Sequence, residues 1–210
     1  RELTGESEER LAKARTSSDP TRFFNVLLEE GVVDLDSATI NRLLVGDRDA
    51  IMLGIRKATY GNEIELRVYC EDCAEVFEAE IGVDEIPVRA LESDRTFEVK
   101  LRKGGRAQVR LAVGSDQNAY MGDPSLSPAE KNTVLLERCV EWVEINGDKN
   151  SVAGFPSLVR DMGVLDRRAI LKELDDRQPG PRYDGLEIEH DECGAKIPVQ
   201  FGLDALFPGL

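Results

Sequence analysis

Two short pairs of metal-binding residue types lie far apart in the chain. Cys70 and Cys73 form one pair, and His190 and Cys193 form the other, each with two residues between its members. This spacing lets a tight turn point both side chains at one ion. Three thiolates and one imidazole are soft ligands that favour zinc over magnesium or calcium. Four ligands leave no position for a water molecule, so the pattern predicts one structural Zn²⁺ ion.

The surroundings of the two pairs form an internal repeat. Each pair is followed by residues that alternate between polar and apolar, which is typical of a β strand. Nine residues after each second cysteine stands a glycine, Gly82 in one copy and Gly202 in the other. The repeat predicts two equivalent hairpins that share one ion and favours metal binding. A thiol-redox pair remains the alternative for Cys70 and Cys73, because an isolated Cys-x-x-Cys is consistent with both.

A shared ion has an energetic consequence, because it closes the long loop between the two hairpins. Structural zinc supplies on the order of 10 kcal/mol of apparent binding free energy, against about 5 kcal/mol of loop entropy. From the sequence we therefore expect replacement of Cys73 or Cys193 by serine to destabilise the whole chain.

The chain lacks the residue combinations of common catalytic sites. His190 is its single histidine, which excludes a Ser-His-Asp triad, and no glycine-rich phosphate loop occurs. Acidic pairs such as Glu29-Glu30 fall on expected helical faces or ends and are interpreted as solvated surface. Cys139 lies in an apolar helical pattern and is expected in the core. We expect a protein without enzymatic activity.

Composition restricts the kinds of partner. The 210 residues include 41 acidic and 27 basic side chains, which gives a formal net charge of −14. This charge opposes broad affinity for nucleic acid or anionic lipid, because phosphate contacts require cations. No apolar stretch approaches the roughly 18 to 20 residues of a membrane span. We therefore expect neither nucleic acid nor a membrane among the partners.

Hydrophobic periodicity predicts an α+β fold whose N-terminal third is helical. An N-terminal helical segment is expected over residues 1–36. The remainder, 37–210, is expected to be a single α+β domain. Zinc-ribbon-like β hairpins at 62–86 and 184–206, joined by helices, would close this domain as a split zinc ribbon.

Between the two ribbon halves, the pattern predicts an inserted β hairpin and several helices. The hairpin is expected at 96–113, where apolar and polar residues alternate on both sides of a glycine pair. Helices are expected over 127–178. The first of these begins at a Ser127 to Glu130 capping box, and its pattern extends to about Ile145. A loop is expected from Gly114 to Ser127, because glycine, serine and proline are frequent there.

The inserted hairpin is basic on an acidic background. Its polar face and tip carry five cations: Lys100, Arg102, Lys103, Arg106 and Arg110. One interpretation is a solvated hairpin. The other interpretation is a docking arm for an acidic neighbour, which includes another copy of this chain. This second interpretation predicts that charge reversal at Arg102 and Arg106 weakens assembly without unfolding the protein.

Several motifs carry a resemblance to a known family. The run LLVGDRDAIMLGIRKATYGNEIELRVYCEDC resembles the baseplate hub assembly proteins of contractile-tailed, T-even-like bacteriophages, in which an Asp-Arg pair opens a helix, a Tyr-Gly follows and a zinc-ribbon knuckle comes next. GFPSLVRDMGVLDRRAILKEL and HDECGAKIPVQFGLDALF resemble the second half of that family. The resemblance places the zinc ligands on Cys70, Cys73, His190 and Cys193, with His190 in place of the more usual cysteine.

The resemblance implies a structural or assembly component of a phage tail baseplate, in its hub region, that works through contacts with other tail proteins. Its location would be the virion, and the host cytoplasm during assembly. Self-association is compatible with this function. A zinc-ribbon module that binds nucleic acid or assists transcription is the alternative, and the charge of −14 argues against it.

Overall fold

Helices form the N-terminal third of the chain, as predicted. The structure is a computed structural model that describes residues 1–92, 94–102, 104–199 and 202–210. The N-terminal helices are α1 (Gly5–Arg15), α2 (Thr21–Gly31), α3 (Ser37–Ile40) and α4 (Val45–Tyr60). Helix α2 buries Phe23, Leu27 and Leu28 at helical spacing, and it packs against α4.

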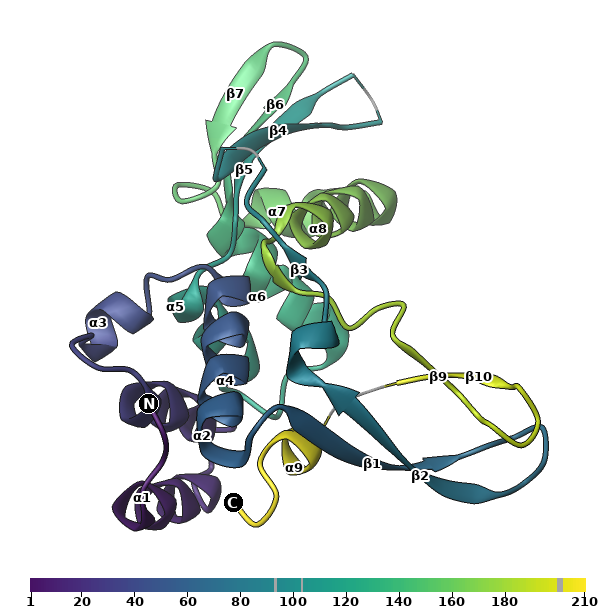
Figure 1. Cartoon of the computed structure of the whole chain (residues 1–210). Helices are drawn as coiled ribbons and strands as arrows, with labels where there is room; N and C mark the ends of the chain where they lie inside the picture. The colour runs from purple at the N-terminus through teal and green to yellow at the C-terminus, as the bar shows by residue number, and fades with distance from the viewer. Residues whose placement is uncertain (93, 103, 200–201) are drawn as a thin grey trace.

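Two β hairpins from distant parts of the chain project side by side from the helices (Figure 1). The first consists of β1 (Glu63–Tyr69) and β2 (Val76–Gly82), which pair antiparallel. The second consists of β9 (Glu187–Glu189) and β10 (Lys196–Pro198). We call these two hairpins, with the turns that connect their strands, the arm.

Short elements tie the arm to the remainder of the molecule. A 3₁₀ turn, η1 (Val83–Glu85), follows β2, and the next strand, β3 (Val88–Arg89), pairs with β8 (Gly180–Pro181). After β10 the chain ends in α9 (Leu203–Leu206). Phe207, which follows α9, is buried and makes an edge-to-face contact with Tyr60 at a centroid distance of 6.2 Å.

A four-stranded antiparallel sheet lies away from the arm (Figure 1). Its strands, in spatial order, are β4 (Thr96–Lys100), β5 (Arg106–Arg110), β6 (Val140–Ile145) and β7 (Asp148–Ser151). The associated helices are α5 (Gly114–Met121), α6 (Pro128–Cys139), α7 (Ser157–Asp161) and α8 (Val164–Arg177). The predicted hairpin at 96–113 is thus confirmed as β4 and β5, and the mixed α and β composition of the fold is also confirmed.

Two predictions about this region were wrong. The helix that begins at the Ser127 capping box ends at Cys139 rather than near Ile145, so β6 and β7 interrupt the range 127–178 that was expected to be helical. Val140, Trp142 and Val143 favour an extended backbone. The backbone groups of β6 form hydrogen bonds with β5 instead of with one another in a helix.

The expected loop after Gly114 contains helix α5 instead. Its glycine and serine content is typical of a loop, but Asp116 accepts a hydrogen bond from the Val113 backbone N–H at 3.0 Å and caps the first turn. Arg110 and Arg138 both bond to the fully buried Asp116 carboxylate. These contacts, which join distant residues, stabilise a helix that local composition does not favour.

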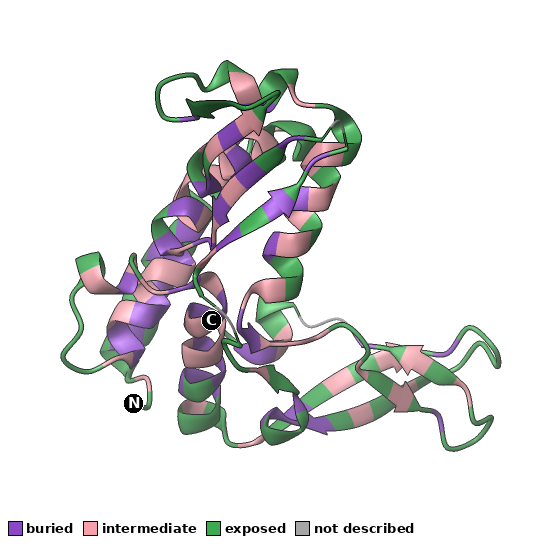
Figure 2. Cartoon of the chain, turned by 90° about the horizontal axis from the view of Figure 1, so that it is seen from above, coloured by how far each residue is buried: buried purple, intermediate pink, exposed green. Residues whose placement is uncertain are grey.

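The buried apolar side chains fall into two clusters. One joins the four-stranded sheet to α6 and α8 and includes Val109, Leu136 and Ile170. The other joins the N-terminal helices to β1 and α9 and includes Leu27 and Phe207. Figure 2 shows that most buried positions lie outside the arm. The domain boundaries proposed from the sequence remain a prediction.

Among the residues that the structure describes, no helix has both the length and the apolar character needed to cross a membrane.

Candidate metal centre

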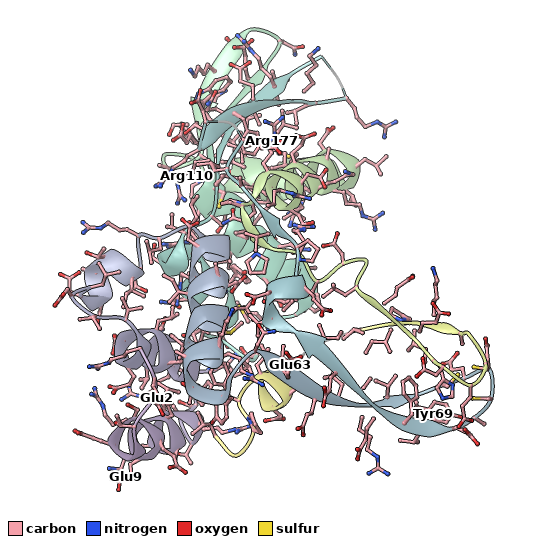
Figure 3. The ribbon with its side chains drawn as sticks, in the orientation of Figure 1. Glu2, Glu9, Glu63, Tyr69, Arg110 and Arg177 are labelled. Carbon is pink, nitrogen blue, oxygen red and sulfur yellow. The ribbon has the colours of Figure 1, made fainter. Side chains whose placement is uncertain are left out.

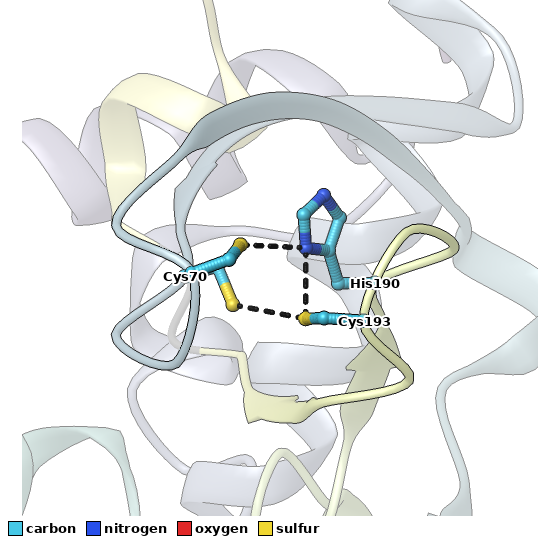
Figure 4. Close-up of side chains that lie close together, drawn as sticks. Cys70, His190 and Cys193 are labelled. Carbon is cyan, nitrogen blue, oxygen red and sulfur yellow. Dashed lines mark hydrogen bonds between the residues drawn. The ribbon is translucent and has the colours of Figure 1, made fainter.

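The four predicted ligands lie together at the end of the arm, where the two hairpins meet. Their ligand atoms are all within 4.8 Å of one another. Cys70 Sγ lies 3.5 Å from Cys193 Sγ, and His190 Nδ1 lies 3.3 Å from Cys73 Sγ and 3.2 Å from Cys193 Sγ (Figure 4). Each hairpin therefore contributes two ligands, although Cys73 and His190 are 117 positions apart in the chain.

The backbones of the two turns are equivalent, as the sequence repeat predicts. The Cys70 N–H donates to Glu75 O at 2.8 Å, and the His190 N–H donates to Ala195 O at the same distance. The residue after each second cysteine has a left-handed backbone: Ala74 with φ 59° and Gly194 with φ 70°. The two turns, which we call knuckles, therefore share their closing hydrogen bond and their left-handed residue, and the second turn also has bonds from the Cys193 and Gly194 N–H groups to His190 O.

The donor set and its spacing fit a zinc ion. With Zn–S near 2.3 Å and Zn–N near 2.1 Å, the edges of a tetrahedral site measure about 3.6 to 3.8 Å. The three separations between ligand atoms are a few tenths of an ångström shorter, so small outward shifts of the side chains would accommodate the ion. Soft sulfur and imidazole ligands disfavour magnesium and calcium. Occupation by zinc remains a prediction.

The thiols of the first knuckle titrate differently. The backbone N–H of Cys73 donates to the Cys70 sulfur and lowers the pKa of Cys70 to about 7. Desolvation and the neighbouring thiols raise the pKa of Cys73 to about 11. The Cys70 side chain is covered from solvent but lies in a thin arm, so its hydrogen bonds outweigh desolvation. A cation is required to hold both sulfurs as thiolates near neutral pH.

Phe77 is a residue of the centre that the sequence pattern did not single out. It belongs to the first hairpin, yet its ring stacks on the His190 ring of the second, with a centroid distance of 4.2 Å and an interplanar angle of 19°. This contact fixes the plane of the imidazole while Nδ1 faces the thiols. Only its position in an alternating strand distinguished Phe77 in the sequence, and that signal predicts a core residue.

Two glutamates lie beside the imidazole. Ligand atoms of Glu75, His190 and Glu192 are within 4.8 Å of one another. A hydrogen bond with Glu192 and its negative charge raise the pKa of Glu75. Carboxylates near a metal-bound histidine commonly accept from its second ring nitrogen and hold its tautomer. The surroundings thus suit a histidine whose Nδ1 is a ligand.

The arm exposes a strongly acidic surface. Its strands and turns, residues 63–82 and 187–198, contain eleven carboxylates and two cations, all on exposed residues. Tyr69 and Val76, which are cross-strand partners next to the first knuckle, are 55% and 52% exposed. Figure 3 shows Tyr69 near the end of the arm. An apolar pair with acidic surroundings suits a partner with basic and apolar groups.

The structure divides the five cations of the basic hairpin. Arg106 pairs with Glu98 and Glu144, and Arg110 pairs with the buried Asp116. Lys100 and Arg102 are exposed, and their side chains form no ion pair with the described residues. Lys103 lies outside the described residues.

Cys139 is fully buried at the end of α6, and burial raises its pKa to about 12. Its neighbours are apolar core residues. The expectation that Cys139 belongs to the core is confirmed, and a thiol with such a high pKa is a poor metal ligand at neutral pH.

A comparison with models of protein families gives a match over nearly the whole chain. Residues 1–208 match the family model described as T4 bacteriophage base plate protein. No curated protein and no solved structure was found to match the chain.

Proposed function

The chain belongs to the T4 bacteriophage base plate protein family, and from this membership we propose that it is a component of the baseplate hub that acts through contacts with other tail proteins. The match over residues 1–208 carries the proposal. Family membership supports a structural role in the phage baseplate, a location in the virion tail and a protein without enzymatic activity. During assembly the protein would be in the host cytoplasm.

In this proposal one zinc ion is bound by Cys70, Cys73, His190 and Cys193 and is purely structural. Support comes from the four converging ligand atoms, which leave no open position for a substrate. The ion would hold the two hairpins together and so determine the shape of the arm. The eleven exposed carboxylates of the arm disfavour nucleic acid as its partner, because they repel phosphate groups.

The partner surface on the basic hairpin is reduced to Lys100 and Arg102 in this proposal. Both cations are exposed, whereas Arg106 and Arg110 are neutralised within the chain. An acidic surface of a neighbouring tail protein, or of another copy of this chain, would complement them. Rim charges of this kind affect association rate and partner choice more than affinity.

A complementation experiment tests the proposal. A phage that lacks this gene is supplied with wild-type protein, and purified tails are examined by immunoblotting and electron microscopy. We expect the protein in baseplates and no complete baseplates without it. Normal baseplates in the absence of the protein, or its exclusion from both tails and assembly intermediates, would refute a baseplate function.

The same system tests the hairpin. The variant Lys100→Glu with Arg102→Glu should fold normally but yield fewer baseplates. A control with the same change in charge, Lys13→Glu with Arg42→Glu, alters two exposed cations of the helical region. If the two variants assemble equally well, the hairpin is not a docking surface.

A further inference from the structure

A cavity of about 220 Å³ lies where helices from both ends of the chain meet. Residues of α2, α4, α5 and α9 line it, and Phe24, Met52 and Met121 form much of its apolar wall. Met121 and Leu203 are lining residues that are 42% and 43% exposed. An apolar cavity with exposed apolar residues at its edge is a common feature of protein interfaces.

Asp49 is the one carboxylate in this lining. Its side chain makes no ion pair or hydrogen bond with the residues that the structure describes. The adjacent Arg48 side chain is directed elsewhere: it donates to Asn25 Oδ1 at 2.5 Å, and its guanidinium lies over the Phe24 ring at 5.0 Å. Burial raises the pKa of Asp49 to about 6, because desolvation of the carboxylate outweighs the favourable charge of Arg48.

The other nearby cation is also engaged. Asp49 borders a second hollow that Arg182 lines, but Arg182 pairs with Asp175 and Asp184. Neither Arg48 nor Arg182 therefore neutralises Asp49 by direct contact. Among the described residues, Asp49 therefore has no cation in direct contact with its carboxylate.

Hydrogen-bond acceptors beside Asp49 are also without partners. Gln117 Oε1 and Asn118 Oδ1 are covered and accept no hydrogen bond from described residues, although both residues line the cavity. An unsatisfied buried polar atom destabilises the folded chain, because it has lost its hydrogen bonds to water. Because Gln117 Oε1 has no internal bond to lose, its side chain can turn toward a donor in the cavity.

We infer that this cavity receives a lysine or arginine side chain of a partner protein. The aliphatic part of that side chain would pack against Phe24, Met52 and Met121, and its cationic end would face Asp49 and Gln117. Such side chains combine an apolar stem with a charged head, which matches an apolar wall with acceptors. The inference rests on the proposed function in one respect, namely that the protein works through protein contacts.

A fragment titration tests the inference on the purified full-length chain. The probe is n-butylguanidinium, and n-butylurea is its neutral counterpart of nearly the same shape. Binding is followed by NMR through the signals of Met52, Met121 and the Gln117 side chain. We expect saturable shifts at these residues with n-butylguanidinium, and binding at least about tenfold weaker with n-butylurea, since a charge-assisted hydrogen bond contributes about 1.5 to 3 kcal/mol.

Two variants complete the test. Asp49→Asn should weaken n-butylguanidinium binding about tenfold, whereas Asp47→Asn, which removes the same charge from the same helix outside the cavity lining, should leave it unchanged. Equal binding of both probes, equal effects of the two variants, or shifts elsewhere in the protein would overturn the inference. Because the titration needs no phage, its failure would leave the proposed baseplate function untouched, and failed complementation would leave the cavity assignment untouched.

Discussion

Replacing Cys193 with serine removes one of the four predicted ligands, and the consequence depends on how the two hairpins are otherwise held together. Besides the ligand cluster, the stacking of Phe77 on His190 joins them. Both apolar clusters lie mainly outside the arm. The metal should therefore be the main source of order in the arm.

The magnitude follows from the loop that the ion closes. Cys73 and His190 are 117 positions apart, but β3 pairs with β8 between them, with Arg89 opposite Gly180. The chain at β8 packs closely against α4 at Gly46. Only glycine permits this approach, because a Cβ at Gly46 would lie 1.5 Å from Pro179 O. The stretches 73–89 and 180–190 then form an effective loop of roughly 26 residues, whose closure costs about 3.5 kcal/mol instead of about 5 kcal/mol.

Zinc binding of about 10 kcal/mol exceeds this closure cost by roughly 6 kcal/mol. Loss of zinc should therefore open the arm but leave the β3 to β8 pairing and both apolar clusters folded. This outcome is narrower than the sequence-based expectation, in which the whole chain was destabilised. For the Cys193→Ser variant we expect amide exchange at the knuckle ends of β1 and β2 to become at least about a thousandfold faster. The protection of core amides, such as those of Ile64, Leu53 and Val109, should change little.

Hydrogen exchange, calorimetry and elemental analysis check this prediction. Wild-type protein should contain one zinc per chain, and Cys193→Ser should contain almost none. Cys139→Ala is the matched control, because it removes a thiol from the core: it should keep its zinc and lower the melting temperature instead. Wild-type protein purified without zinc, or a Cys193→Ser variant whose arm remains protected, would refute the reasoning.

Three further changes have separate expected results. Phe77→Ala should weaken zinc binding about 3- to 10-fold in chelator competition, because the His190 ring loses a stacking contact that contributes about 0.5 to 1.5 kcal/mol. Unchanged zinc affinity would contradict this role of Phe77. Ala74→Gly should slow the loss of zinc to a chelator, because alanine in a left-handed conformation costs about 1 kcal/mol. Gly194 occupies the equivalent position in the second knuckle. Equal rates of zinc loss from the variant and the wild type would show that Ala74 is unstrained. The folded-state pKa of Asp49, about 6, exceeds the ordinary value of 3.8, so the folded chain binds more protons between these values and loses stability as pH rises through them. Asp49→Asn should therefore raise the free energy of unfolding by about 3 kcal/mol at pH 7.5 but not at pH 3.5. Urea denaturation at both pH values checks this, and equal gains at the two values would contradict it.

The convergence of Cys70, Cys73, His190 and Cys193 was the most predictable feature of the molecule, because its signals are local. Two ligands three residues apart, each pair at the turn of a short hairpin, leave few alternatives for the backbone. The repeat also indicated that the two turns would be alike, and their matching closing hydrogen bonds and left-handed residues agree with this. What the sequence could not provide was the stacking of Phe77, because a contact between two hairpins leaves no periodic signal within either.

The errors arose where contacts between distant residues override local preference. Helix α5 has a loop-like composition, yet Asp116 caps it and binds Arg110 and Arg138. The helical periodicity of α6 continues into residues that instead pair with β5. The sequence shows the positive charge of the basic hairpin, but it does not show which cations are free to bind a partner. Arg106 is paired with Glu144 of β6, a residue that sequence periodicity had placed in a helix.

The position of the ion relative to the two apolar clusters bears on how the protein functions. Removing the predicted zinc would leave most of the core unchanged, so the ion is better understood as fixing the shape of a projecting arm than as holding the chain folded. An arm with eleven exposed carboxylates and a half-exposed Tyr69 beside the knuckle gains little stability from those groups, and like charges directly opposite, such as Glu65 and Glu80, oppose strand pairing. In the proposed baseplate function, zinc binding would then control whether this acidic surface is presented to another tail protein.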